Sequence, residues 1–328
     1  MYILKFKEIY KTPIWGGNKI AAFKGKNIDL ASVGESWEIS AVEGDVSIVA
    51  NGEDAGKSLQ ELVERDGERL MGEHVARYFG TTFPLLVKFI DAHDNLSIQV
   101  HPDDELARRR HNSFGKTEMW YVISAEPDAG LYSGLAQAIT PDEYMQRVDD
   151  NTIMEVLQFH NVKADDVFYL PSGRIHAIGR GVFIAEIQQT SNVTYRIYDY
   201  NRIGNDGRPR ELHTEYARDA IDYKLYDDLK TQYAPRKNDA VELVDCPYFT
   251  TSLLDLDRVT NRPVAIYDSF VVYVCMQGSV RIEANNGTWV ELVQGETCLV
   301  PAEIESVTLT PSPHVKMLES YVRDERMR

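Results

Sequence analysis

Short apolar runs, some alternating with polar positions and some continuous, recur along the chain and are bounded by Gly, Pro, Asn and Asp. This pattern is typical of an all-β sandwich or barrel, whose strands are short and separated by marked turns. The fold class that we predict is therefore mainly β. In the first two thirds of the chain the runs predict strands at 36–41, 46–50, 85–91, 96–100, 119–124, 166–170, 182–188 and 193–198.

A few helices are expected between these strands. The clearest one begins at Thr140, an N-cap residue that is followed by a proline at the first helical position and by Glu143, which completes a capping box. We interpret the helices as insertions into a β framework, because they are few and lie between strand segments. The others are predicted at 58–65, 73–78, 103–110 and 215–221.

The composition changes near residue 236. From about residue 222 to 240 the chain is polar and charged, and 235–239 reads Pro-Arg-Lys-Asn-Asp, which predicts an exposed connection. We therefore expect a larger domain over residues 1–235 and a smaller one over residues 236–328. Within the smaller domain, β-type runs are found at 249–256, 270–276, 279–284 and 297–301.

Two pairs of segments suggest that the two domains are related. Residues 167–171 (Val-Phe-Tyr-Leu-Pro) resemble 297–301 (Thr-Cys-Leu-Val-Pro), and 120–123 resemble 272–275. The offset is 130 residues in the first pair and 152 in the second, so the first domain must hold extra material between the two elements. We assign that insertion to 128–155 and predict a duplicated β domain.

Charge and cysteine content exclude several classes of function. The 328 residues contain 35 Lys+Arg and 51 Asp+Glu, a net charge of −16, which repels nucleic acid and an anionic membrane surface. No apolar run approaches the roughly 20 residues of a membrane span, and the three cysteines show no CxxC spacing. We therefore expect a cytoplasmic protein that binds neither nucleic acid nor a membrane. An anionic ligand would need basic side chains at its binding site to overcome the overall negative charge.

Four polar residues in the first domain point to a metal site. Residues two apart in a strand face the same side, so Gln99 and His101 should point together. Glu118 opens another β run, and His176 follows a Pro-Ser-Gly turn at the end of a third. Two imidazoles, a carboxylate and an amide oxygen suit a borderline divalent ion such as Zn²⁺. The spacing alone predicts only a divalent metal.

These motifs resemble a known family. The segment 171–176, Pro-Ser-Gly-Arg-Ile-His, resembles the second motif of the cupin superfamily, small β-jelly rolls that hold a metal inside the barrel. The first cupin motif normally reads His-x-His, whereas Gln-Val-His-Pro-Asp-Asp at 99–104 and Gly-Lys-Thr-Glu-Met-Trp at 115–120 resemble the type I phosphomannose isomerases, most closely their short bacterial members. The resemblance spans about residues 11–215. Further segments in the order of that family are 13–17, 34–38, 86–90 and 189–196.

The resemblance implies two cupin-like β-jelly-roll domains with a few inserted helices, the first of them catalytic. It implies one zinc ion per chain, and the reversible conversion of mannose 6-phosphate into fructose 6-phosphate by proton transfer through an enediol. The zinc ligands that it implies are Gln99, His101, Glu118 and His176.

The alignment of the two domains bears on the metal site. It sets Phe270 against Glu118, and Ser306 or Glu305 against His176. We therefore expect a C-terminal domain without a metal site and with a structural role.

Isomerisation requires stabilisation of negative charge on the carbonyl oxygen and a base that moves a proton between C1 and C2. The resemblance assigns the first task to Arg196. For the base, Lys116 shares a strand face with Glu118, and Glu186 matches a carboxylate of the family. A zinc-linked water and His101 are further candidates, and the sequence leaves the choice open.

The expected partner is a small-molecule sugar phosphate, bound by a monomer or a homodimer. Candidate phosphate contacts are Ser97, which shares the face of Gln99, and the basic residues Lys88, Lys116 and Arg202. Trp15 and Trp37 are candidates for the wall against which the sugar packs.

Two alternative functions remain open: a metal-dependent cupin oxygenase and a non-catalytic, carbohydrate-sensing cupin. Gln99 argues against the oxygenase, because non-haem iron favours two histidines and one carboxylate, although the other three candidate ligands form such a set if Gln99 does not bind. A non-catalytic relative would be expected to lose Lys116, Glu118 or Arg196, and all three are present.

Overall fold

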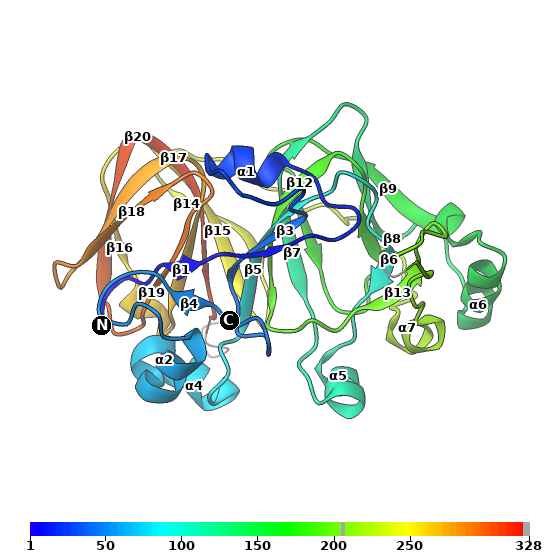
Figure 1. Ribbon diagram of the computed structural model, residues 1–328, viewed down its shortest axis with the longest axis horizontal. Coiled ribbons are helices and arrows are strands. Elements are labelled where there is room, and N and C mark those ends of the chain that lie inside the picture. Colours follow the sequence, from blue (N-terminus) through cyan, green and yellow to red (C-terminus); the bar gives the residue numbers. More distant parts are fainter. Residues whose placement is uncertain (205–206, 324–328) are drawn as a thin grey trace.

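Three antiparallel sheets make up most of the computed structural model, which describes residues 1–204 and 207–323 (Figure 1). The six-stranded sheet has the order β10 (Val167–Leu170), β7 (Glu118–Ala125), β12 (Val182–Gln189), β5 (Leu85–Asp91), β3 (Glu35–Ile39), β2 (Ile9–Lys11). The five-stranded sheet has the order β13 (Tyr195–Tyr198), β6 (Ile98–Val100), β11 (His176–Ile178), β8 (Gly130–Leu135), β9 (Leu157–Asn161).

The third sheet belongs to the C-terminal part of the chain. Its order is β14 (Ala240–Asp245), β15 (Thr250–Leu256), β20 (Ser306–Tyr321), β17 (Val271–Ala284), β18 (Trp289–Val293), with β16 (Thr260–Pro263) paired to β20 and β19 (Thr297–Val300) paired to β17. A small separate ladder joins β1 (Phe6–Lys7) to β4 (Ile48–Val49). The predicted mainly β fold is therefore confirmed.

Short helices lie outside the sheets, and within the described residues none is long and apolar enough to cross a membrane. Leu106 of α5, Tyr144 of α6 and Ala217 of α7 pack on the outer face of the five-stranded sheet. Figure 1 shows α6 and α7 at that end of the molecule and α2 and α4 at the other. The helices are α1 (Lys19–Lys24), α2 (Leu59–Asp66), α3 (Glu68–Met71), α4 (Glu73–Phe79), α5 (Asp104–His111), α6 (Pro141–Asp149) and α7 (Thr214–Ala220), with 3₁₀ turns η1 (Ile153–Val156) and η2 (Ala265–Tyr267).

The six-stranded sheet is covered on both faces. On β5, Val87 and Phe89 pack with Phe270 and other C-terminal residues, whereas Ile90 belongs to the core between the two sheets of the first domain. Every residue of β5 and β12 is therefore buried, and this two-sided burial explains why their sequences are nearly continuous apolar runs.

The structure modifies the predicted elements in several places. The two strands predicted at 270–276 and 279–284 are one strand, β17, whose bend is absorbed at Gly278 (φ +78°). A Cβ there would lie 2.0 Å from the His314 carbonyl oxygen, so only glycine fits. Strand β20 was not predicted, because Pro311 and Pro313 interrupt its alternating pattern. The other elements that were not predicted include β8, β9, β14, β18, α1 and α3.

The two β domains share a strand arrangement. β10 pairs with β7 so that Leu170 lies opposite Glu118, and β19 pairs with β17 so that Val300 lies opposite Val271. In the C-terminal part, Val271 therefore occupies the position that corresponds to Glu118. The sequence alignment, which set Phe270 against Glu118, was wrong by one residue. The pair β8–β9 in the first domain corresponds to the pairing of the second half of β17 with β18 in the C-terminal part. The extra material of the first domain therefore lies between β8 and β9, at 136–156, and not at the predicted 128–155.

The predicted boundary at residue 235 falls between α7 and β14. The first residues of the chain nevertheless pack on the C-terminal part, since Ile3 lies in the core of that part and Leu4 exchanges two backbone hydrogen bonds with Leu299. The division into 1–235 and 236–328 stays a prediction.

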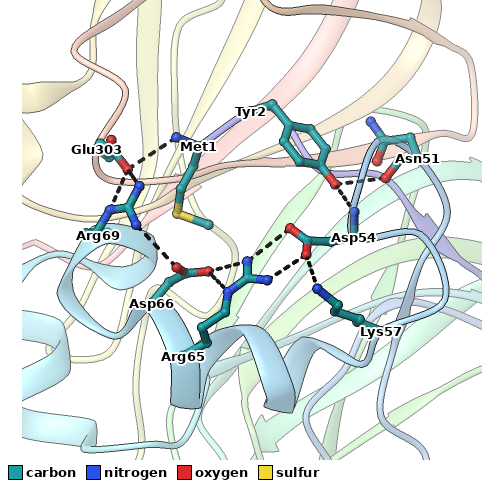
Figure 2. Close-up of polar contacts among 9 residues, drawn as sticks. All are labelled: Met1, Tyr2, Asn51, Asp54, Lys57, Arg65, Asp66, Arg69 and Glu303. Atoms are coloured by element: carbon teal, nitrogen blue, oxygen red, sulfur yellow. Dashed lines mark hydrogen bonds and ion pairs between the residues drawn. The ribbon is translucent and has the colours of Figure 1, made fainter.

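A network of ion pairs links α2 and α3 to the loops around them (Figure 2). Arg65 donates to both oxygens of the buried Asp54, at 2.6 and 3.0 Å, and also to Asp66. Arg69 of α3 reaches Glu303 in the C-terminal part at 2.8 Å. The Arg65 guanidinium holds the pKa of the Asp54 carboxyl well below its usual range.

We expect Asp54→Asn to lower the free energy of unfolding by about 1 kcal/mol, because it removes the bidentate pair with Arg65 and the ion pair with Lys57, whose basic partners are both partly exposed. Since the folded-state pKa of Asp54 is depressed, this contribution is present above the unfolded-state pKa of about 4 and is lost as the pH falls below it. Urea denaturation at several pH values measures both effects. Asp239→Asn, which removes a pair exposed on both sides, is the control; equal losses in the two variants would contradict the prediction.

Candidate active site

Strand alternation directs the candidate ligands into the first barrel. Ile98 and Val100 pack toward the helices outside the five-stranded sheet, so Gln99 between them faces inward. On β7, Met119 faces the C-terminal part and Trp120 faces the barrel interior. Glu118 shares the inward face with Trp120. Gln99 and Glu118 therefore both face the interior of the first barrel.

Glu118 lies between the two histidines. Its Oε2 is 3.4 Å from Nε2 of His101, and its Oε1 is 3.2 Å from Nε2 of His176. His101 Nδ1 donates to the Val193 carbonyl at 3.0 Å, and His176 Nδ1 donates to the Arg174 carbonyl at 2.8 Å. Because the Nδ1 atoms carry the protons, both Nε2 atoms are unprotonated, and their lone pairs are directed toward the carboxylate of Glu118.

These facing atoms lack ordinary partners. His101, Glu118 and His176 are all buried, and His101 Nε2 and both carboxylate oxygens of Glu118 accept no hydrogen bond. Each such buried group costs about 1–3 kcal/mol unless something else satisfies it. The ligand atoms of the three residues lie within 4.8 Å of one another, and over the described residues no other group of three or more His, Cys, Asp or Glu does so. The donor set fits a divalent cation.

The charge states of the triad suit the same role. Burial lowers the pKa of His101 to about 3, assisted by the Lys116 ammonium, and burial also lowers the pKa of His176. Burial opposes ionisation of Glu118, but the Lys116 ammonium, with its Nζ at 3.3 Å, favours the charged form, and the pKa of Glu118 lies well below its usual value. At neutral pH the triad therefore presents two neutral imidazoles and one carboxylate.

Gln99 lies beside the triad, as the sequence predicted. It is the direct ladder partner of His176, and its amide nitrogen is 3.3 Å from His176 Nε2. Rotation of the amide about its last bond exchanges nitrogen and oxygen, and this would present the oxygen to the same point. Gln99 is therefore placed to supply a fourth ligand.

A cavity of about 490 Å³ opens beside the triad, with Gln99 and Lys116 in its wall. Trp15, Trp37 and Trp120 also line it, which places the two predicted tryptophans at the cavity. Its surface carries more positive than negative groups although the chain is strongly acidic. The cations are Lys11, Lys88, Lys116, Arg196 and Arg210, and the carboxylates are Glu35, Asp45 and Glu186.

Arg196 and Arg210 lie close enough in the cavity wall for their positive charges to repel each other. Burial lowers the pKa of Arg196, and repulsion from Arg210 adds to the effect. The Nε of Arg196 is buried without a hydrogen-bond partner. Arg210 donates to both oxygens of Asp199, at 2.7 and 2.5 Å, so one carboxylate compensates for only part of this charge. The pair is suited to an anionic ligand.

Most of the residues predicted for catalysis and substrate binding meet at this cavity. Lys116, Glu186 and Arg196 line it, and so do Ser97 and Lys88. Burial raises the pKa of Glu186, whose Oε1 accepts from Trp120 Nε1 at 2.8 Å.

Arg202 does not join them. It donates to Asp199 and to the Asn95 carbonyl and is absent from the cavity wall. Sequence reasoning missed Lys11, Asp45 and Arg210, which lie on an edge strand or in loops where no periodic pattern marks a face, and Glu35, whose strand was predicted one residue short.

Comparisons with known proteins indicate the family of this chain. The family model for the phosphomannose isomerase type I catalytic domain matches residues 3–132. The chain is 38% identical over 256 residues to mannose-6-phosphate isomerase ManA of Bacillus subtilis, covering 77% of this chain and 79% of that protein. It is 43% identical over 208 residues to mannose-6-phosphate isomerase of Streptococcus mutans, covering 63% and 64%.

Solved structures extend the likeness over the whole chain. The crystal structure of mannose 6-phosphate isomerase from Bacillus subtilis superposes with a TM-score of 0.88 at 30% identity, covering 98% of this chain and 99% of that one. The apo form from Salmonella typhimurium gives a TM-score of 0.78 at 15% identity, which shows the fold alone. The chain therefore belongs to the type I phosphomannose isomerase family.

Proposed function

We propose that this protein is a metal-dependent isomerase that interconverts mannose 6-phosphate and fructose 6-phosphate. The observation that carries the proposal is the buried triad of His101, Glu118 and His176 next to a cationic cavity, in which His101 Nε2 and both oxygens of Glu118 lack hydrogen-bond partners. Membership of the family supports the choice of reaction, and the cavity supports an anionic substrate in an otherwise acidic chain.

We propose zinc as the metal, one ion per chain, held by the triad and by Gln99. Two neutral imidazoles with oxygen donors are a common zinc ligand set, and the Nδ1 hydrogen bonds of both histidines fix the ring orientation that such a site needs. A bound zinc ion would supply Lewis acidity, which polarises a carbonyl oxygen or a water molecule.

We propose two roles for the basic residues of the cavity: stabilisation of charge on the sugar and contact with its phosphate. Arg196 is proposed to stabilise the negative charge that develops on the sugar oxygen, since its guanidinium is partly desolvated and an interaction in such an environment is stronger than in water. Arg210, held by Asp199, and the Ser97 hydroxyl are proposed to contact the phosphate. Arg202, which is engaged elsewhere, is left without a substrate role.

Two groups remain for the movement of the proton between C1 and C2. Both nitrogens of His101 are committed, Nδ1 to the Val193 carbonyl and Nε2 to the metal position, which argues against His101 as the base. Lys116 and Glu186 both line the cavity. The raised pKa of Glu186 brings it closer to neutral pH, where a group exchanges protons most efficiently.

Removal of the metal should abolish turnover. In an assay that couples fructose 6-phosphate formation from mannose 6-phosphate to a detectable reaction, we expect chelation to lower the rate by at least about 100-fold and added Zn²⁺ to restore it. Unchanged activity in protein shown by metal analysis to be zinc-free would contradict the metal role. Iron in the purified protein, together with oxygen consumption, would favour the oxygenase alternative.

Substitutions should separate metal binding from catalysis. We expect His101→Ala and Glu118→Ala to lose both bound zinc and activity, because each removes a ligand at the centre of the site. Arg196→Ala should retain zinc and lose turnover by about 10²–10³-fold. Metal analysis and the coupled assay on the same preparations measure both properties. His314→Ala, a partly exposed histidine of the C-terminal part, is the control and should retain zinc; loss of zinc from Arg196→Ala would refute the separation.

A further inference from the structure

Four side chains of the six-stranded sheet form a continuous row inside the cavity. Trp37 on β3 is the direct ladder partner of Lys88 on β5, Lys88 is that of Glu186 on β12, and Glu186 is that of Trp120 on β7. Side chains at directly opposed positions lie close enough to interact. All four residues line the cavity, so the row is a wall of the site already described.

Lys88 and Glu186 form an oppositely charged pair at the centre of this row, an indole lies at each end, and Glu35 approaches Lys88 from beside Trp37. Trp37 Nε1 donates to Glu35 Oε2 at 2.6 Å, and Trp120 Nε1 donates to Glu186 Oε1 at 2.8 Å. The Lys88 ammonium lies between the two carboxylates, 3.8 Å from Glu35 Oε2 and 3.3 Å from Glu186 Oε2. The same ammonium lies over the Trp37 ring, 4.8 Å from its centre.

This environment leaves Lys88 poorly suited to bind a phosphate. Its side chain is only 5% exposed and already has two carboxylate partners. A doubly charged phosphate that approached the ammonium would meet Glu35 and Glu186 at nearly the same distance, and like charges repel strongly in such a buried place. The sequence-based role of Lys88 as a phosphate contact therefore conflicts with its surroundings.

Glu186, by contrast, depends on Lys88. Its carboxylate is buried, one oxygen is held by the Trp120 indole, and the other, Oε2, has an ion-pair partner in Lys88 but no hydrogen bond. That buried oxygen lies in the cavity wall and keeps the capacity to accept a hydrogen bond from a sugar hydroxyl that reaches it. Burial and the negative charge of Glu118 favour the protonated form of Glu186, and Lys88 and Lys116 oppose them.

We propose that Lys88 is a positioning residue of the isomerase, which keeps the Glu186 carboxylate ionised and oriented toward the sugar, with Glu35 as the opposing anchor. The role toward the sugar rests on the proposed isomerase function, whereas the effect of Lys88 on Glu186 does not. It changes the role of Lys88 from substrate contact to support of another side chain, and it gives Trp37 and Trp120 a defined task in holding the two carboxylates.

The four tryptophans of the chain allow a test that does not need activity. In metal-loaded protein labelled with ¹⁵N-tryptophan, the Trp120 indole signal should report protonation of Glu186, and Glu186→Gln should abolish its pH dependence. We expect Lys88→Met to raise the midpoint of this titration by at least about one pH unit, because the nearest positive charge is lost. An unchanged midpoint would overturn the proposal.

Glu35→Gln supplies a second arm with the opposite sign, in case Lys88→Met fails to fold. Loss of the Glu35 charge makes the surroundings of Glu186 more positive, so the Trp120 midpoint should fall. A midpoint that stays in place or rises would contradict the coupling along the row. Lys11→Met is the matched control, since Lys11 also lies over the Trp37 ring but pairs with Asp45, and it should leave the Trp120 midpoint unchanged.

Kinetics distinguish positioning from phosphate binding. We expect Lys88→Met to lower kcat by about 10–100-fold while KM for mannose 6-phosphate changes less than about threefold. A KM raised about tenfold or more at unchanged kcat would assign Lys88 to the phosphate and overturn the proposal. If the wild-type protein shows no isomerase turnover, the proposed function fails, and the indole titration still decides whether Lys88 controls Glu186.

Discussion

The two-sided burial of the six-stranded sheet is the constraint on which the rest of the structure depends. Along β5 and β12, alternate side chains face the C-terminal part, as Phe89 and Ala185 do, and those between them face the barrel, as Lys88 and Glu186 do. A shift of the strand register by one residue would bury the charged side chains in the interface between the first domain and the C-terminal part, and would move the apolar side chains into the cavity. One strand register therefore determines both the cavity and this interface.

This register places two buried carboxylates in the barrel, and each has its own lysine. Lys116 lies 3.3 Å from Glu118, and Lys88 lies 3.3 Å from Glu186. Two neighbouring carboxylates in one apolar barrel would otherwise favour protonation of one of them. The net charge of −16 therefore does not describe the barrel interior, where each buried carboxylate is paired with a lysine.

Much of the site was predictable from the sequence because it lies on strands. Alternation places Gln99 on the inner face of β6, and the turn before His176 identified the second imidazole. Residues that reach the site from loops carry no such signal: Arg210 lines the cavity, whereas Arg202 in the same segment is turned to Asp199 and the Asn95 carbonyl.

The fold itself followed the same rule. Most strands with long apolar runs were found, but β14 and β18 were missed. β20 was missed at its two prolines, although it pairs along most of its length with β15, β16 and β17. Long-range pairing, which the local sequence does not encode, decides such a segment.

The two parts of the chain that share a strand arrangement show how a buried carboxylate can indicate either structure or function. In the C-terminal part, Glu319 is fully buried, and both of its oxygens are satisfied, by Arg262 at 2.5 and 3.0 Å and by Tyr273 at 2.7 Å. Such a group needs nothing further and stabilises the core. In the first domain, Glu118 is equally buried, but neither oxygen accepts a hydrogen bond.

Glu118 is paired with the Lys116 ammonium at 3.3 Å, but its oxygens can still accept hydrogen bonds or bind a cation. The ladder position of Glu118 is taken by Val271 in the other part of the chain, where no carboxylate has to be accommodated. The difference between the two domains is therefore visible in hydrogen bonding rather than in fold. It distinguishes the first barrel, whose buried carboxylate keeps its acceptor oxygens open, from the second, whose buried carboxylate is fully hydrogen-bonded.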